Sequence, residues 1–414
     1  MKEHGILLII CDGMGDRADR KRNFRTPLGV AEKPNMDALA KTGSIGIVDP
    51  IAPGVRPGSD VAHFALLGYD PYEFYTGRGG LEAVGAGLKM GAGDIAFRCN
   101  FSTVNDRMIV TDRRAGRSTY GREELAKVLN TIKLKESEVS FEFVPTVEHR
   151  AVLVLRGKGL SRRVTDTDPH TEGRTAQRSK PEDESDESKR TSEILNDFTE
   201  KSHQMLGDHP INVDRVRRGH PPANIILSRG PGSLPPMEKL ETKYSIKTAC
   251  VGVAPIVRGI CSLAGMRLID VKGATGGLDS DFKAKTGAAL DTMKENDLVF
   301  LHIKAPDVAS HNGNFEQKAE AIERIDEGIA EVVRSVDLTV DYVVLTSDHA
   351  TPVSVKDHSA DPVPILIAGP DFDASGVETF SERTAAVGNL GRLLAIHLMP
   401  IMMNRLGRVE KFGF

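Results

Sequence analysis

The stretch "LVFLHIKAPDVASH" at residues 298–311 begins as an almost unbroken apolar run and ends in Asp307 and His311, four residues apart. A short continuous apolar run is typical of a parallel strand that is buried on both faces of a sheet. A carboxylate and an imidazole are side chains that commonly bind metal ions. The stretch therefore predicts a central strand that leads directly into candidate metal ligands.

Similar apolar runs recur along the chain, and segments of helical period separate the later ones. The runs lie at residues 6–11, 248–253, 267–271, 342–347 and 364–368, and the helical segments at residues 282–294 and 314–336. Alternating strands and helices indicate βαβ units and a sheet covered on both faces. We therefore predict an α/β fold with a mostly parallel sheet between two layers of helices.

The middle of the chain has a different pattern. The segments "RMIVTD", "VSFEFVP" and "HRAVLVLRG" alternate like half-buried antiparallel strands, and a helical pattern ends near Leu206. We predict a smaller α+β domain at residues 71–243, inserted into a discontinuous domain of residues 1–70 and 244–414. The charged run at residues 180–190 is expected to be a solvated loop.

Composition narrows the classes of function. The 414 residues carry 54 basic and 58 acidic side chains, a net charge of −4, which gives no general attraction to nucleic acids or anionic membranes. The four cysteines form no C-x-x-C pair, as is usual for buried thiols in a reducing compartment. No signal peptide or apolar run of about 18 residues is recognisable. We expect a soluble, cytoplasmic protein without nucleic-acid or membrane partners, and the oligomeric state stays open.

Metal-binding residue types follow several of the predicted strands. Because the carboxyl ends of parallel strands meet at one edge of a sheet, these side chains should converge there. An aspartate at a strand end is also a common helix cap, so each residue alone has a structural alternative. Three buried carboxylates together require a comparable positive charge, which two ions of manganese, zinc or magnesium would supply. The converging residues are Asp12, Asp307, His311, Asp348, His349 and His358; His302 is interpreted as structural.

A nucleotide cofactor is not expected. The segment "GMGDRA" at residues 13–18 fits the G-x-G-x-x-A form of a dinucleotide-binding turn. The residues after it lack the apolar stripe of a helix that packs on a sheet, and Pro27 ends the segment. The sequence also contains no Walker loop.

Ser59 lies just ahead of a helical pattern in "RPGSDVAHFALLGYDP", residues 56–71. One interpretation is a helix N-cap. The other is a nucleophile, because a helix N-terminus attracts phosphate and a metal-bound serine hydroxyl loses its proton more readily. Both interpretations stay open on the residues alone.

Seven motifs, in order along almost the whole chain, resemble the archaeal-type, cofactor-independent phosphoglycerate mutases of the alkaline phosphatase superfamily. They are "CDGMGD", "GSDVAHFALLGYDP", "DRRAGR", "EHRAVLVLRG", "VTDTDPH", "PDVASHNG" and "TSDHATPVSVKDHSADPVPILIAG". The resemblance implies a metal-bearing phosphatase-like domain with an inserted transferase domain. It implies a phosphoserine at Ser59 and no need for bisphosphoglycerate. One metal would lie on Asp307, His311 and His358, and the other on Asp12, Ser59, Asp348 and His349.

The same resemblance implies interconversion of 3-phosphoglycerate and 2-phosphoglycerate in glycolysis and gluconeogenesis. Basic side chains should bind the substrate, since arginine matches both carboxylate and phosphate. The candidates are Arg113, Arg117, His149, Arg150, Asp166, Arg229, Lys247 and Lys304. A phosphomonoesterase or a phosphopentomutase of the same superfamily is the alternative, because only the insert would set the acceptor. A non-catalytic metal-binding protein is a further alternative, against which Ser59 argues.

Overall fold

The computed structural model describes residues 4–413, and these form two compact units. Unit 1 extends to Tyr75 and resumes at Pro236, and unit 2 spans Thr76–Pro235. The sequence places the limits of the insert at residues 71 and 243. They differ because α4 (Pro71–Phe74) and α9 (Leu240–Tyr244) belong to unit 1. Within that unit, the hydroxyl of Tyr69 donates to the carbonyl of Glu238 at 2.6 Å, and the Tyr69 ring packs edge-on against Phe74.

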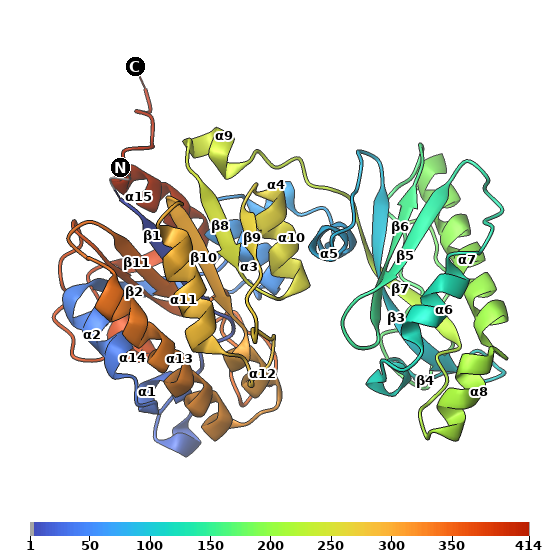
Figure 1. The fold of residues 1–414 in the computed structure, drawn as a ribbon, viewed down its shortest axis with the longest axis horizontal. Helices are drawn as coiled ribbons and strands as arrows, with labels where there is room; N and C mark the ends of the chain where they lie inside the picture. The colour runs from blue at the N-terminus through green and yellow to red at the C-terminus, as the bar shows by residue number, and fades with distance from the viewer. Residues whose placement is uncertain (1–3, 414) are drawn as a thin grey trace. The chain divides into compact units, whose positions relative to one another are not determined.

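The described part of unit 1 contains an eight-stranded mixed sheet (Figure 1). In spatial order its strands are β13 (Gly391–Leu394), β2 (Ser44–Asp49), β12 (Val363–Ala368), β11 (Tyr342–Thr346), β1 (Ile6–Cys11), β10 (Leu298–Ile303), β8 (Thr248–Val251) and β9 (Arg267–Ile269). Among these strands, β12 alone runs antiparallel to both of its neighbours. The α/β fold with a mostly parallel sheet is confirmed, but the expectation that residues 364–368 form a parallel strand is wrong.

Helices cover both faces of this sheet. One layer contains α1 (Pro27–Val30), α2 (Pro34–Thr42), α11 (Phe282–Met293), α13 (Phe315–Ser335) and α14 (Glu382–Ala385). The other contains α3 (Ser59–Leu66), α10 (Pro255–Leu263), η3 (Ala395–His397) and α15 (Leu398–Arg405). Figure 1 shows α11 and α13 side by side against the strands. The two layers explain the continuous apolar runs, because successive residues of β1 are buried on opposite faces.

Unit 2 has an antiparallel sheet in the order β4–β3–β6–β5, with β7 paired to β3. These strands are β3 (Ile95–Val104), β4 (Val110–Asp112), β5 (Ser140–Pro145), β6 (Arg150–Arg156) and β7 (Ile225–Gly232). The helices are α5 (Arg78–Gly85), α6 (Arg122–Leu129), α7 (Asp186–Leu206) and α8 (Pro210–Arg217), with a short turn η2 (Ala115–Arg117). Helices α6 and α7 cover the face that carries Phe97 and Phe101. Helix α5 packs Ala83 on the opposite face, against Ala96 and Val154.

The charged run at residues 180–190 is only partly a loop. Ser185 caps α7 by accepting a hydrogen bond from the backbone N–H of Ser188, so the helix begins at Asp186. Asp186 and Glu187 lie in the first turn, where acidic side chains are favoured by the helix dipole. The remaining short elements are η1 (Arg20–Arg22) and α12 (Ala305–His311). Within residues 4–413, no helix is both long and apolar enough to cross a lipid bilayer.

A fully buried lysine ties α13 to two loops of unit 1. The Nζ of Lys318 donates to the carbonyl of Gly15 at 3.0 Å, to Oδ2 of Asp16 at 2.9 Å and to the carbonyl of Thr351 at 3.0 Å. All three ammonium protons therefore have acceptors, which offsets the loss of hydration. The loops held in this way follow β1 and β11.

Lys318→Met should strongly destabilise unit 1, because it leaves the carboxylate of Asp16 buried without its counter-ion. Loss of one partner of a buried pair costs about 3–5 kcal/mol. Urea denaturation followed by circular dichroism measures the change. Lys283→Met removes a lysine whose side chain is 64% exposed in its pair with Glu327, and should change the free energy of unfolding by less than about 0.5 kcal/mol. Equal stability of both variants would contradict the role of Lys318.

Candidate metal centre

The metal-binding residue types lie at the carboxyl edge of the unit 1 sheet. Strand β1 pairs in parallel with β10 and β11, so that Ile10 lies opposite both His302 and Thr346. Asp12 follows β1 and donates its backbone N–H to the carbonyl of Ile303 at 2.8 Å. Asp348 follows β11 at the same edge. The register of the strands therefore places the carboxylates of Asp12 and Asp348 at the same edge of the sheet.

Helix α12 brings the third carboxylate to the same place. It begins directly after β10 with Ala305-Pro306, and proline is favoured in a first turn because its missing N–H has no partner there. Asp307 and His311 are one helical turn apart, and His311 Nε2 lies 3.3 Å from Asp307 Oδ1. His358 Nε2 lies 3.8 Å from that same oxygen, and its ring stacks on His349 at 3.5 Å between centroids.

Two sets of ligand atoms are close enough to hold an ion. One contains Asp12, Asp348 and His349, and the other contains Asp307, His349 and His358. Within each set the ligand atoms lie within 4.8 Å of one another. The family resemblance places His311 rather than His349 beside Asp307 and His358. The structure brings all of these side chains into one cluster, in which His349 faces both positions.

The charge of the cluster fits divalent cations. Asp12, Asp307 and Asp348 are each at most 3% exposed. Lys304 donates to Asp12 Oδ2 at 2.9 Å and to Asp307 Oδ2 at 2.7 Å, so one cation serves two carboxylates. Burial, together with the charge of Asp12, raises the pKa of Asp348 well above its usual range. In the described chain, Asp12 Oδ1 and Asp348 Oδ2 are buried without a hydrogen-bond donor, and metal ions would satisfy them.

The hydroxyl of Ser59 points at this cluster. Gly58 is the N-cap of α3, Ser59 is its first residue, and the Ser59 side chain makes no capping hydrogen bond. Instead, Ser59 Oγ lies 3.0 Å from Nε2 of His349. The helix-cap interpretation of Ser59 is therefore wrong, and its hydroxyl is placed beside the candidate ligands.

Unit 2 carries a separate basic cluster on the face of its sheet that α5 partly covers. Arg98 of β3 lies opposite Arg229 of β7, and Asn100 of β3 lies opposite Arg150 of β6. Residues paired in register point to one face, and so do residues two apart on a strand, so these arginines share a surface. His149 lies beside Arg150, and burial, followed by the charge of the nearby arginines, lowers its pKa to about 3.

Two buried carboxylates lie among these arginines. Asp168 accepts two hydrogen bonds from Arg113, at 2.9 and 2.6 Å. Glu82 accepts one from Arg78 Nε at 2.7 Å and lies 3.3 Å from Arg98 Nε. Sequence reasoning did not select Arg78, Arg98, Glu82 or Asp168. A charged residue inside the strand pattern "IAFRCNFSTV" was the available signal for Arg98.

The remaining substrate candidates have different surroundings. Asp166 accepts from the backbone N–H of Gly230 and contacts His170, both at 2.8 Å, so it shapes the loop beside Arg229. Arg117 is exposed in η2 with a φ of 54°. Lys247 is not brought to the cluster of unit 1. It immediately precedes β8, and its carbonyl accepts from the N–H of Asp297, so it lies at the amino edge of the sheet.

The chain is similar over its full length to proteins with one common description. Residues 40–212 match the profile of a family described as 2,3-bisphosphoglycerate-independent phosphoglycerate mutase. A protein of that description from Methanothermobacter thermautotrophicus is 46% identical over 411 residues, 99% of each chain. Another, from Methanocaldococcus jannaschii, is 46% identical over 414 residues, 100% of each chain. The chain belongs to the family of 2,3-bisphosphoglycerate-independent phosphoglycerate mutases.

Solved structures agree with this membership, and the chain is therefore an enzyme, an isomerase. The cofactor-independent phosphoglycerate mutase of Thermoplasma acidophilum is 37% identical, with a TM-score of 0.71, covering 97% of this chain and 99% of its own. A protein from Pyrococcus horikoshii is 36% identical, with a TM-score of 0.86 over the whole of both chains. The family resemblance drawn from the motifs is confirmed.

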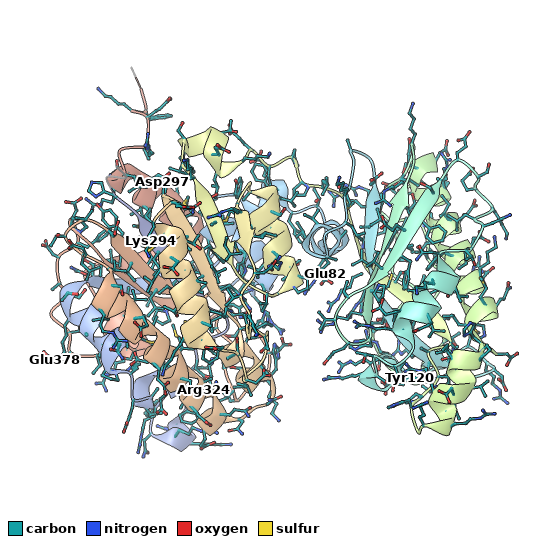
Figure 2. All side chains as sticks on the ribbon, in the orientation of Figure 1. Glu82, Tyr120, Lys294, Asp297, Arg324 and Glu378 are labelled. Carbon is teal, nitrogen blue, oxygen red and sulfur yellow. The ribbon has the colours of Figure 1, made fainter. Side chains whose placement is uncertain are left out.

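Asp348→Asn and His311→Ala should both lower the content of bound metal. Each removes a ligand atom or charge from a cluster of buried carboxylates, and even a residue behind a ligand changes metal affinity by about 10- to 100-fold. Elemental analysis after manganese loading and dialysis measures the content. Glu378→Gln, which removes a carboxylate that is 85% exposed (Figure 2), is the matched control. Parental metal content in both site variants would place the ions elsewhere.

Proposed function

We propose that this chain interconverts 3-phosphoglycerate and 2-phosphoglycerate by phosphoryl transfer through Ser59. The observation that carries the proposal is the Ser59 hydroxyl beside a cluster of three buried carboxylates and three histidines, in a chain of this family. The names of the relatives support a reaction without a bisphosphoglycerate primer. The reaction would be a step of glycolysis and gluconeogenesis.

The residues that would hold two divalent ions are the seven of the unit 1 cluster. Asp307, His311 and His358 would hold one, and Asp12, Ser59, Asp348 and His349 the other, with His349 placed to serve either. Manganese, zinc and magnesium are the candidates, because the donor set mixes carboxylate oxygen with imidazole nitrogen. When bound, such ions lower the pKa of a serine hydroxyl and neutralise charge on phosphoryl oxygens.

The covalent step belongs to Ser59. Its Oγ attacks phosphorus in line, the bond from phosphorus to the substrate oxygen breaks, and that oxygen takes up a proton equivalent to the one Ser59 lost. The glycerate then turns, and its other hydroxyl loses a proton and attacks the phosphoserine. The bond from phosphorus to Ser59 Oγ breaks, and this oxygen regains an equivalent proton. Lys304 supports this chemistry from the chain itself, because it places a positive charge next to Asp12 and Asp307.

The arginines of unit 2 are what would separate a mutase from a phosphatase. After the first transfer, free glycerate carries only its carboxylate charge and must be retained until it accepts the phosphoryl group. Arg150 and Arg229 offer guanidinium groups on one sheet face, and Arg113 is held next to them by Asp168. A guanidinium can make two charge-assisted hydrogen bonds to a carboxylate. An enolase-coupled assay of purified protein with 3-phosphoglycerate, with and without manganese, tests the proposed reaction.

Ser59→Ala should abolish mutase activity and leave the fold intact. Its side chain makes no helix cap, and among the described residues its hydrogen-bond partner is His349, so little structural support is lost. Circular dichroism should match that of the parent, while the enolase-coupled rate falls to background. The exposed residue Ser335 gives a control, since Ser335→Ala should retain the parental rate. Turnover near the parental rate in Ser59→Ala would exclude the covalent route.

Arg150→Ala should lower isomerisation and raise the share of substrate that is hydrolysed. Loss of one charge-assisted contact costs about 2 kcal/mol of binding, so glycerate should escape before the second transfer. The ratio of inorganic phosphate to 2-phosphoglycerate is the measurement. Arg156→Ala, six residues further along the same strand, is the matched control and should leave the ratio unchanged. An unchanged ratio in Arg150→Ala would place glycerate retention elsewhere.

A further inference from the structure

Glu82 is an acidic residue buried among arginines of unit 2. It lies on α5 (Figure 2) and is 6% exposed. Arg78, one turn earlier on the same helix, donates from Nε to Glu82 Oε1 at 2.7 Å, and the Nε of Arg98 lies 3.3 Å from that oxygen. Burial opposes ionisation of Glu82, but Arg98, Arg78 and Arg150 outweigh it, and its pKa is lowered. The carboxylate is therefore charged at neutral pH.

The position of Glu82 follows from the packing of α5. Ala83 packs against Ala96 and Val154 and fixes the helix to the apolar end of the sheet face. Arg98 is two residues beyond Ala96 on β3, so it emerges on the same face, next to the helix. Glu82 therefore contacts Arg98 at the boundary between the apolar part of this sheet face and the arginines.

Glu82 does not neutralise this face. Burial lowers the pKa of Arg98 to about 9, and the neighbouring Arg78, Arg229 and Arg150 contribute to that decrease. Within residues 4–413, the Nε atoms of Arg98, Arg150 and Arg229 are buried without an aligned hydrogen-bond acceptor. Several guanidinium groups thus share the charge of one carboxylate, and donors remain for a bound anion.

We propose that Glu82 is a positioning residue that orients Arg78 and Arg98 and limits the excess positive charge of this face. The inference rests on the proposed binding of substrate by the unit 2 arginines. Glu82 competes with any anion for these guanidinium groups, so a small anion such as inorganic phosphate gains little. A phosphoglycerate, which presents a phosphate and a carboxylate at a fixed spacing, gains contacts at several correctly oriented arginines at once.

Glu82→Gln should therefore move two quantities in opposite directions. Removal of the carboxylate adds one net positive charge and takes away the acid that Arg78 and Arg98 both face, so inorganic phosphate should inhibit about fivefold more strongly. Loss of orientation should lower kcat/KM for 3-phosphoglycerate by about tenfold or more. The candidate metal ligands are the same in the parent and in Glu82→Gln. The ratio of the inhibition constants of phosphate for these two proteins therefore reports on unit 2.

Glu82→Asp separates charge from position. It keeps the carboxylate but withdraws it by one methylene, so phosphate inhibition should stay near the parental value while kcat/KM falls. Glu142→Gln is the matched control. It removes a carboxylate of the same unit that is 44% exposed and pairs with Arg156, and it should change neither quantity.

The proposal would be overturned if the folded Glu82→Gln variant showed both weaker inhibition by phosphate and a lower kcat/KM. A merely structural role for Glu82 predicts that both decrease together. If Glu82→Gln does not fold, parental kcat/KM in Glu82→Asp would overturn it instead. Failure of the proposed function is distinguishable, since the parental protein would then not convert 3-phosphoglycerate at all. Phosphate binding to Glu82→Gln, measured by calorimetry, would still test the effect on charge.

Discussion

The parallel pairing of β1 with β10 and β11 is the constraint on which the rest of unit 1 depends. It sets Ile10 level with His302 and Thr346, so that the chain leaves all three strands at one edge. A shift of one residue in either pairing would exchange the two faces of that strand and bury different side chains under each helix layer. The register is therefore fixed by apolar packing along the strands, and the positions of Asp12 and Asp348 follow from it.

The parts of the structure that depend on this constraint could be predicted from the sequence. Apolar runs identify the central strands, and the convergence of strand ends identifies the metal-binding residue types. The prediction of a substrate-binding role for Lys247 did not take the strand direction into account. Lys247 precedes β8 and therefore lies at the amino edge of the sheet, opposite the edge that carries the candidate ligands. Strand β12 was given the wrong direction, since an apolar run buried on both faces does not record its direction.

Charged residues that act in the interior were harder to find. Lys318 lies four residues before Ile322 on α13, which is the core side of the helix, yet lysine in an amphipathic helix usually marks the solvated face. Arg98 lies on a strand of an antiparallel sheet, where alternating charged residues are expected on the outer face. The burial of Arg98 and Glu82 depends on how α5 packs, and no local pattern encodes that.

Three lysines of unit 1 supply positive charge near its buried carboxylates; Lys285 and Lys318 are buried, and Lys304 is 29% exposed. Lys304, after β10, bridges Asp12 and Asp307, and Lys318 of α13 pairs with Asp16. Lys285 of α11 donates to the backbone carbonyl of His302, next to the end of β10, and burial lowers its pKa to about 8. These lysines offset part of the negative charge, and among the described residues Asp12 Oδ1 and Asp348 Oδ2 still have no hydrogen-bond donor that would compete with a metal ion.

The two units differ in the kind of hydrogen-bonding capacity that they leave unused. Among the described residues, buried carboxylate oxygens of Asp12 and Asp348 in unit 1 have no hydrogen-bond donor, and buried Nε atoms of Arg98, Arg150 and Arg229 in unit 2 have no aligned acceptor. Unsatisfied acceptors favour a cation, and unsatisfied donors favour an anion. The proposed reaction, which moves a phosphoryl group and keeps its acceptor, would use both capacities, and this gives a physical reason for an α/β domain with candidate metal ligands to carry an arginine-rich insert.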